Sequence, residues 1–177
     1  VDLLNLRAIR PEAPADFQEL FDAERYRRSQ AYTRERTRFG LVASAVRLLV
    51  LLGFWLGGGF GVVERAVGAL GLGEIPTGLV FVGVLALGPF LLGMAFSWWA
   101  TFVIEEKYGF NRSTSRTFWT DVAAGLGLAV VLGGPLLAAV LWLFAAAGAH
   151  AWLFCWALVA AWTVGMQYVA PTWIMPL

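Results

Sequence analysis

Four apolar stretches, each about 20 residues long or longer, constrain this chain more than any other feature of its sequence. A helix of about 20 residues crosses the roughly 30 Å of hydrocarbon in a bilayer. The stretches are continuous rather than alternating in polarity, which favours helices over a β-barrel. We therefore predict an all-α integral membrane bundle whose four transmembrane helices cover residues 39–63, 77–103, 122–147 and 151–169.

The composition excludes several classes of protein. The 177 residues are 59% hydrophobic and 14% charged, whereas a soluble domain is less than about half apolar and about a quarter charged. The arginines lie beside the spans and no nucleic-acid-binding module is visible, so we predict a lipid bilayer and no nucleic acid as partner. Cys155 is the single cysteine, which excludes a disulfide within the chain.

Residues 1–38 form a separate region in our prediction, with an irregular lead-in followed by an amphipathic cytoplasmic helix. Asp16 and Glu19 have the spacing of a capping box, which predicts where that helix begins. Six arginines then precede the first span: Arg25, Arg27, Arg28, Arg34, Arg36 and Arg38. We interpret them as a charge run that faces lipid headgroups, and the alternative is that they bind a peptide or a partner protein.

Polar and helix-breaking residues interrupt the apolar runs. Arg47 lies about two turns inside the first span, where it either extends toward the arginine-rich end or faces a polar cavity. Pro89 and Pro135 should kink or break their helices, because proline has no N–H to donate. A stripe of small residues, which would let another helix pack closely, repeats every four positions: Gly53, Gly57 and Gly61.

The positions of lysine and arginine predict the orientation of the spans. These residues mark the cytoplasmic side when they lie in short loops. The region before the first span and the 104–121 loop carry most of them, and the 64–76 loop on the other side carries Arg65 alone. We therefore predict that residues 1–38, the 104–121 loop and the C-terminus are cytoplasmic.

The 104–121 loop is the one long polar interruption between apolar runs. Its carboxylates Glu105 and Glu106 are consecutive, so on a helix they point about 100° apart and cannot both face one site. They could be a proton-relay pair, a ligand pair, or helix-end charges held by salt bridges. Gly109 permits a turn after Tyr108, and Asn111 can close that turn through a hydrogen bond to the backbone.

Known catalytic motifs are missing from the sequence. His150 is the only histidine, and we place it in a tight turn on the outer side, far from the two carboxylates. A histidine-based zinc site needs several converging ligands, which this chain does not supply. The sequence has no G-x-S-x-G, P-loop or G-x-G-x-x-G motif. We therefore predict no catalytic residue, metal ligand or cofactor in this chain.

Three runs of sequence resemble the N-terminal membrane half of the CAAX prenyl protease family. They are FVIEEKYGFNRSTSRTFWTD, then LGGPLLAAVLW, then APTWIMPL at the end. The upstream run AERYRRSQAYTRERTRFGL is similar to the family's segment before its second span. The resemblance covers about residues 15–177 in the same order and with similar spacing.

The resemblance implies more than the residues alone. Members are integral-membrane zinc metalloendopeptidases in which seven spans surround a water-filled chamber, and the four spans here would be the second to the fifth. Their zinc site uses an H-E-x-x-H helix and a later glutamate, both in a C-terminal half. This chain has no H-E-x-x-H motif, so neither the metal nor the general base carries over. It opens with Val1, and we expect it to be a part of a longer protein that cannot cleave by itself.

On this resemblance we expect the chain to wall the chamber and to support binding of a peptide or prenylated-peptide substrate. The candidates for contact with substrate or with the C-terminal catalytic domain are Glu105, Glu106, Lys107, Asn111 and Arg112. The candidates for shaping the chamber are Arg47, Pro89 and Pro135. The membrane would be the bacterial inner membrane, or the endoplasmic reticulum or inner nuclear membrane of a eukaryote.

Two other functions stay open on the sequence alone. The chain could be a small multi-pass transport or channel subunit, with Arg47 and the kinked spans lining a path. It could also be a membrane scaffold that binds a soluble partner through its arginine-rich helix.

Overall fold

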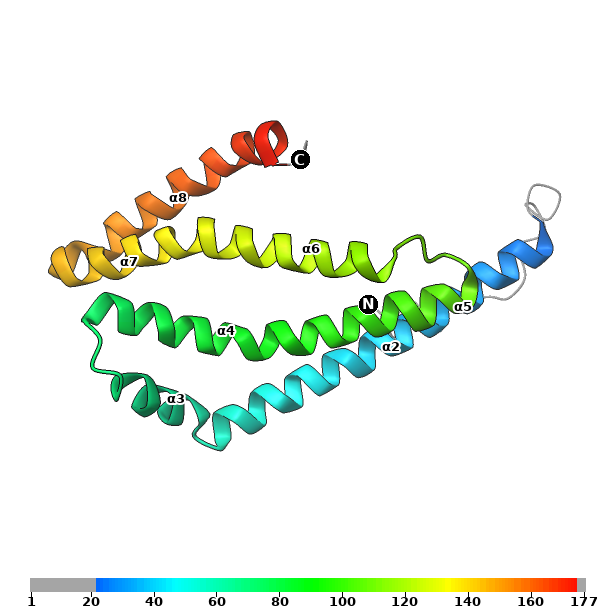
Figure 1. Cartoon of the computed structure of the whole chain (residues 1–177), viewed down its shortest axis with the longest axis horizontal. Coiled ribbons are helices and arrows are strands. Elements are labelled where there is room, and N and C mark those ends of the chain that lie inside the picture. The colour runs from blue at the N-terminus through cyan, green and yellow to red at the C-terminus, as the bar shows by residue number, and fades with distance from the viewer. Residues whose placement is uncertain (1–21, 175–177) are drawn as a thin grey trace. The chain divides into compact units, whose positions relative to one another are not determined.

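The computed structural model describes residues 22–174, and these form helices and connecting turns with no strand (Figure 1). Four helices are long and apolar enough to cross a membrane, within Ala23–Leu56, Glu74–Tyr108, Ser115–Ala146 and Gly148–Thr172. The predicted all-α membrane fold is confirmed. The predicted start of the amphipathic helix at Asp16 and Glu19 lies outside the described residues.

The helices follow one another with short connections. In chain order they are α2 (Ala23–Leu56), α3 (Gly59–Gly68), α4 (Glu74–Trp99), α5 (Glu106–Tyr108), α6 (Ser115–Leu128), α7 (Gly134–Ala146) and α8 (Ala151–Val169). Wider π-helical turns occupy Ala100–Glu105, Ala129–Gly133 and Ala170–Ile174, and a 3₁₀ turn occupies Gly148–His150. The chain divides into two compact units: residues up to 62 with 85–122, and residues 63–84 with those from 123 onward.

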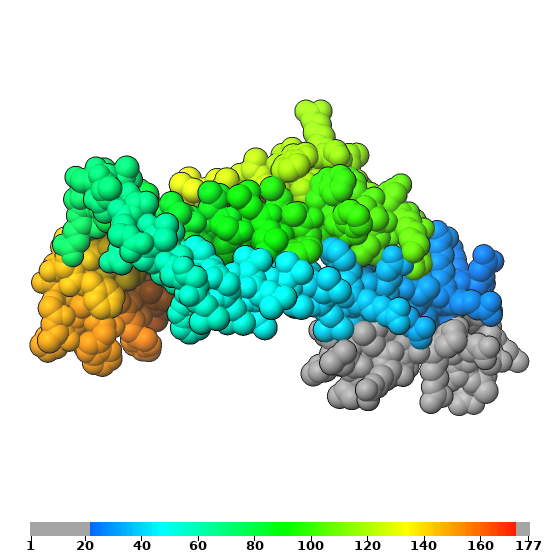
Figure 2. All heavy atoms as spheres, turned by 90° about the horizontal axis from the view of Figure 1, so that it is seen from below, coloured from blue at the N-terminus to red at the C-terminus, as the bar shows by residue number. Residues whose placement is uncertain are grey.

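In the first unit, α2 packs beside the second half of α4. Asp22 caps α2 by accepting a hydrogen bond from the Glu24 N–H at 3.0 Å. The helix then runs without a break through the predicted boundary at residue 38, so the depth at which it enters the bilayer stays a prediction. Phe39 meets Phe96 of α4 at 5.8 Å between ring centroids, and Ala43 is buried. Together α2 (blue to cyan) and this part of α4 (green) form one continuous surface (Figure 2).

A glycine turn ends α2 earlier than the sequence predicted. The Gly57 N–H bonds back to the Gly53 carbonyl, and Gly58 adopts a left-handed conformation with φ of 73°. Residues other than glycine adopt this conformation at a cost, so three consecutive glycines favour a stop here. Phe54 and Phe60 pack edge to face across the turn with centroids 5.0 Å apart.

This turn corrects three sequence-based expectations. The first predicted span, 39–63, crosses the turn instead of forming one straight helix. Gly53 and Gly61 belong to different helices, so the predicted small-residue stripe does not form a single packing face. The predicted 64–76 loop is shorter, because α3 extends through Gly68.

In the second unit, α7 and α8 form a helical hairpin that packs near the start of α4. A Cβ atom at Gly78 would lie 2.8 Å from Leu141 Cδ1, so α4 approaches α7 closely at that point. The turn between α7 and α8 lies where the sequence predicted it, with Gly148 at a φ of 53°. Ala151 and Cys155 are buried against α7, and Cys155 Sγ lies 3.7 Å from the Val140 carbonyl.

The prolines affect their helices in different ways. Pro135 lies in the first turn of α7, and the α-helical pattern before it opens into the Ala129–Gly133 π turn. The helical run Ser115–Ala146 continues through this wider turn, so Pro135 does not break it, and proline lies where its missing N–H costs little. Pro89 lies inside α4, which continues past it. Whether Pro89 and Pro135 shape a chamber stays a prediction.

Replacing Gly59 with alanine should destabilise the protein. The new Cβ would lie 2.7 Å from Phe54 Cγ and would force that ring away from Phe60. We expect a loss of about 1–3 kcal/mol, measured as a lower thermal unfolding midpoint of the purified full-length protein. Gly53→Ala is the matched control, because no atom lies within 4 Å of its new Cβ. Equal midpoints for the two variants would contradict the packing of Phe54 against the turn.

Candidate functional site

One face of α2 gathers polar and aromatic side chains near its N-terminal end. Tyr32, Glu35, Arg36 and Phe39 occur at helical spacing, so they lie on the same side of the helix. Tyr32, Glu35 and Phe39 are half-buried there. This face meets the π turn at the end of α4 and the short helix α5.

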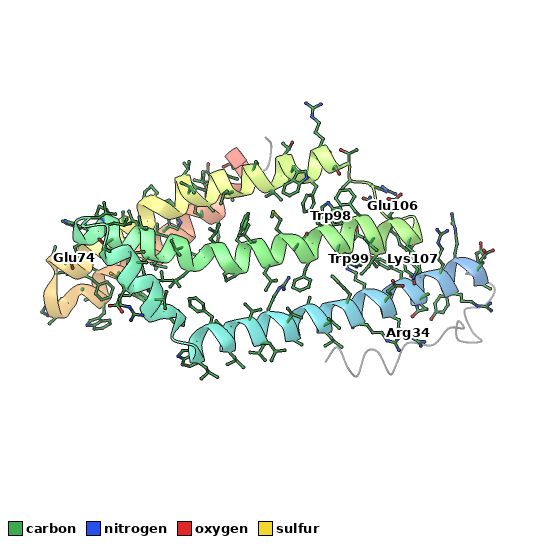
Figure 3. The ribbon with its side chains drawn as sticks, turned by 60° about the horizontal axis from the view of Figure 1, so that its bottom comes forward. Arg34, Glu74, Trp98, Trp99, Glu106 and Lys107 are labelled. Carbon is green, nitrogen blue, oxygen red and sulfur yellow. The ribbon has the colours of Figure 1, made fainter. Side chains whose placement is uncertain are left out.

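The π turn determines which residues at the end of α4 and in α5 face α2. A π turn holds one more residue than an α turn, so each side chain after it is rotated by about 100° from its place in an uninterrupted α-helix. Within this turn Ile104 is buried, with 3% of its surface exposed, and Glu105 follows it toward α2. Figure 3 shows Lys107 in the space between α5 and α2.

Two ion pairs join the helices. Arg36 Nη1 donates to Glu105 Oε1 and also to the Tyr32 hydroxyl, which lies 3.4 Å from the same carboxylate oxygen. Lys107 Nζ donates to Glu35 Oε2 at 2.7 Å, and the Tyr108 hydroxyl donates to that oxygen at 2.6 Å. We call these six residues the α2–α5 clasp: Tyr32, Glu35, Arg36, Glu105, Lys107 and Tyr108.

The loop after α5 is closed by its own hydrogen bonds. Gly109 takes a φ of 72°, and the N–H groups of Phe110 and Asn111 both donate to the Glu105 carbonyl, at 2.8 and 3.2 Å. The Asn111 side chain accepts from the Ser113 N–H at 2.8 Å and donates to Glu106 Oε2 at 2.9 Å. This arrangement is an Asx turn, in which the side chain takes the place of a backbone acceptor.

Aromatic packing covers the junction between loop and helix. The Tyr32 ring lies 4.8 Å from Phe110 and 5.6 Å from Tyr108, measured between centroids. Such tilted and edge-to-face pairs contribute about 0.5–1.5 kcal/mol each beyond their buried area. Tyr32 therefore belongs both to the polar clasp and to the apolar support of the loop.

The two ion pairs have similarly exposed cations and differ mainly at the carboxylate. Arg36 and Lys107 are 52% and 58% exposed, whereas Glu105 and Glu35 are 22% and 36% exposed. Exposed pairs contribute roughly 0–1 kcal/mol, so each pair adds only modest stability by itself. Both groups lie beyond the predicted apolar spans. There, hydrogen bonds from Lys107 and then Tyr108 lower the pKa of the Glu35 carboxyl, and Glu35 raises the pKa of Lys107.

The structure brings most of the predicted site residues together. Glu105, Glu106, Lys107 and Asn111 lie within one short segment, and the two adjacent carboxylates bind different partners, as their spacing predicts. Lys107 bonds to Glu35, not to its neighbouring carboxylates. Arg112 is exposed, with no hydrogen bond or ion pair to any residue in the range 22–174.

Sequence reasoning also set the loop too wide and missed part of the site. Of the predicted 104–121 loop, only residues 109–114 lie outside helix, because α5 extends through Tyr108 and α6 begins at Ser115. Tyr32 and Glu35 were not predicted. The available signal was the helical spacing of Tyr32, Glu35, Arg36 and Phe39, which the surrounding run of arginines obscured.

The described residues do not fit a catalytic metal centre. Across residues 22–174, no three His, Cys, Asp or Glu side chains lie close enough together to hold a metal ion. The clasp carboxylates are already engaged by arginine, lysine and tyrosine. Such a cluster can fix two helix ends against each other, but it supplies no ligand set for zinc.

Comparison with known proteins identifies relatives over the whole chain. The sequence profile described as "CAAX prenyl protease N-terminal, five membrane helices" matches residues 2–177. The rice CAAX prenyl protease 1 homolog is 28% identical over 100% of this chain and 44% of its own length. The probable CAAX prenyl protease 1 of Schizosaccharomyces pombe is 30% identical over 96% of this chain and 38% of its own length.

A solved structure also matches the fold. The crystal structure of S. mikatae Ste24p superimposes with a TM-score of 0.82 and 25% identity, covering 93% of this chain and 40% of the solved chain. The present chain therefore spans about two fifths of the length of these relatives.

Replacing Glu105 with glutamine should destabilise the protein more than the same change at Glu106. Glu105 bonds to Arg36 on α2, so the change removes the ion pair that joins the two helices at their half-buried carboxylate. We expect about 1 kcal/mol for Glu105→Gln and less than about 0.5 kcal/mol for Glu106→Gln, whose partner Asn111 is local. Thermal unfolding of the purified variants compares them. A larger loss at Glu106 would contradict the clasp.

Proposed function

Because the chain belongs to the CAAX prenyl protease N-terminal family, we propose that it serves a larger zinc metalloendopeptidase as the wall of a membrane chamber that binds peptide. The family match identifies the chain as an N-terminal membrane domain of this family. Its four long apolar helices make it part of an integral, multi-pass membrane protein. The activity of the whole protein, its peptide or prenylated-peptide substrate and the chamber itself are parts of the proposal.

The α2–α5 clasp is the observation that carries this proposal. It joins segments about 70 positions apart in the sequence at one end of two membrane helices, with Arg36 bound to Glu105 and Lys107 to Glu35. A cluster of paired charges and tyrosines gives a rigid edge that still exposes polar groups. Such an edge suits the docking of a separate catalytic domain, or contact with the backbone of a bound peptide.

The catalytic metal would come from elsewhere in the full protein. Residues 22–174 offer no ligand cluster, and the whole sequence lacks H-E-x-x-H. We therefore place zinc, with its activated water and general base, in a C-terminal catalytic domain of the same protein. This chain would supply position and enclosure and no catalytic residue.

The distribution of positive charge supports a cytoplasmic position for the clasp. The arginines of α2 before Phe39 and the basic residues of the 104–121 segment lie on the side that the positive-inside rule assigns to the cytoplasm. In this topology the C-terminus shares that side, so a following catalytic domain could reach the clasp. The membrane would be the inner membrane of a bacterium, or the endoplasmic reticulum or inner nuclear membrane of a eukaryote.

Joint replacement of Glu105 by glutamine and Asn111 by alanine in the full-length protein should lower peptide turnover more than it lowers folding. Both changes loosen the 105–111 segment, but a loss of a few kcal/mol leaves most molecules folded when total stability is about 5–15 kcal/mol. We expect turnover of a prenylated reporter peptide to fall at least about tenfold, which corresponds to about 1.4 kcal/mol of transition-state stabilisation.

The matched control is Arg116→Gln, an exposed residue of α6 whose side chain has no bond within the described part of the chain. Its turnover should stay at the level of the unmodified protein. Full turnover by the folded double variant would contradict a role for the clasp. Selective ion or solute flux through proteoliposomes that contain the protein would instead favour a transport function.

A further inference from the structure

Arg47 is the only charged side chain inside the four predicted spans. It lies eight positions after Phe39, about 12 Å along α2 from the predicted edge of the hydrocarbon. A guanidinium near mid-bilayer costs at least about 2.5 kcal/mol unless a partner compensates. An arginine that stays at this depth, and does not extend toward the arginine-rich end, therefore needs an anionic partner or a water-filled cavity.

The structure holds the Arg47 guanidinium in a defined place. Its Cζ lies 5.4 Å from the centroid of the Phe96 ring on α4, and Phe39 packs on the same ring at 5.8 Å. The ring attracts the cation through its face, but it neutralises no charge. Within residues 22–174 no carboxylate lies within ion-pair distance of Arg47, and its side chain is exposed.

A second polar group lies beside Arg47 without a partner. Ser44, one turn earlier on α2, is exposed and makes no hydrogen bond to any residue in the described range. The hydroxyls of Thr33, Thr37 and Thr163 each donate to the carbonyl four residues earlier, whereas those of Ser29, Ser44 and Ser97 do not. The Ser44 hydroxyl is therefore available to a ligand.

Small residues leave room near these two donors. Gly40 lies one turn before Ser44 on α2, and Gly93 lies one turn before Phe96 on α4. No atom lies within 4 Å of the position that a Cβ would take at either glycine. A group the size of a carboxylate could therefore approach the guanidinium from α2 or from α4.

We propose that Arg47 and Ser44 bind a carboxylate of a peptide held within the membrane domain, which rests on the proposed peptide-binding function. A guanidinium presents parallel N–H donors that match the two oxygens of a carboxylate, and a hydroxyl adds a third donor. Phosphate has the same donor requirements, but lipid phosphates lie outside the roughly 30 Å of hydrocarbon. A peptide held in the proposed polar chamber can bring its carboxylate to this depth, which favours a polypeptide carboxylate over a lipid phosphate.

The test compares two peptides that differ only at their C-terminus. A labelled farnesylated peptide with a free carboxylate and the same peptide with a C-terminal amide are titrated against full-length protein in phosphatidylcholine nanodiscs, with fluorescence anisotropy as the readout. We expect the unmodified protein to bind the acid at least about tenfold more tightly, which is the affinity that one charge-assisted hydrogen-bonded pair provides.

Arg47→Gln should abolish this preference, because it should weaken binding of the peptide with the free carboxylate and leave binding of the amidated peptide unchanged. Arg47→Lys should keep part of the preference, because the charge remains while the paired N–H donors are lost. Ser44→Ala should reduce the preference by a smaller factor. Arg38→Gln is the matched control, an exposed arginine on the same helix outside the predicted span, and it should leave the preference intact.

Several results would overturn the site. Equal binding of acid and amide by the unmodified protein would overturn the carboxylate site alone, whereas no binding of either peptide would also count against the proposed function. An unchanged preference in Arg47→Gln would assign Arg47 to packing or to a carboxylate of the protein itself. Loss of a retained anionic lipid from Arg47→Gln in native mass spectrometry, with the peptide preference intact, would assign the site to a lipid phosphate.

Discussion

The ion pair between Arg36 and Glu105 is the interaction on which the arrangement of the first unit depends. Apolar helices in lipid gain little from hydrophobic burial against one another, so packing detail and polar contacts decide how they meet. Most of α2 and α4 is apolar and exposed in this chain. A charge pair at one end, supported by Tyr32 and the Glu35–Lys107 pair, fixes the register that the apolar surfaces leave open.

The π turn at Ala100–Glu105 explains how adjacent residues can serve different purposes. The extra residue in this turn rotates the end of α4 so that Glu105 meets Arg36, while Glu106 remains free to bond to Asn111. Gly109 then reverses the chain, and two N–H groups return to the Glu105 carbonyl. A single residue thus holds α2 through its side chain and closes the following loop through its backbone.

The sequence predicts the four apolar helices well because their length is set by bilayer thickness, and a run of apolar residues of that length can be recognised directly in the sequence. It also predicts the Gly109 turn and the Asn111 side-chain bond, since both are local. It does not predict the Gly57–Gly58 break, because the apolar run continues through it. The partners Glu35 and Tyr32 are missed for a different reason. Pairing across about 70 positions depends on how two helices pack together, and neither segment alone determines that packing.

Two arginines on the same helix differ in how their charge is compensated by their surroundings. Arg36 lies before the predicted span and is bound by Glu105, so its charge is satisfied within the chain. Arg47 lies eleven positions further, inside the predicted span, and among residues 22–174 its recorded contact is with the Phe96 ring. Leucine or methionine at position 47 would avoid the cost of burying a charge in hydrocarbon. That cost is most readily offset when the guanidinium gains an anionic partner in the working protein, which makes position 47 the most informative place to look for a ligand.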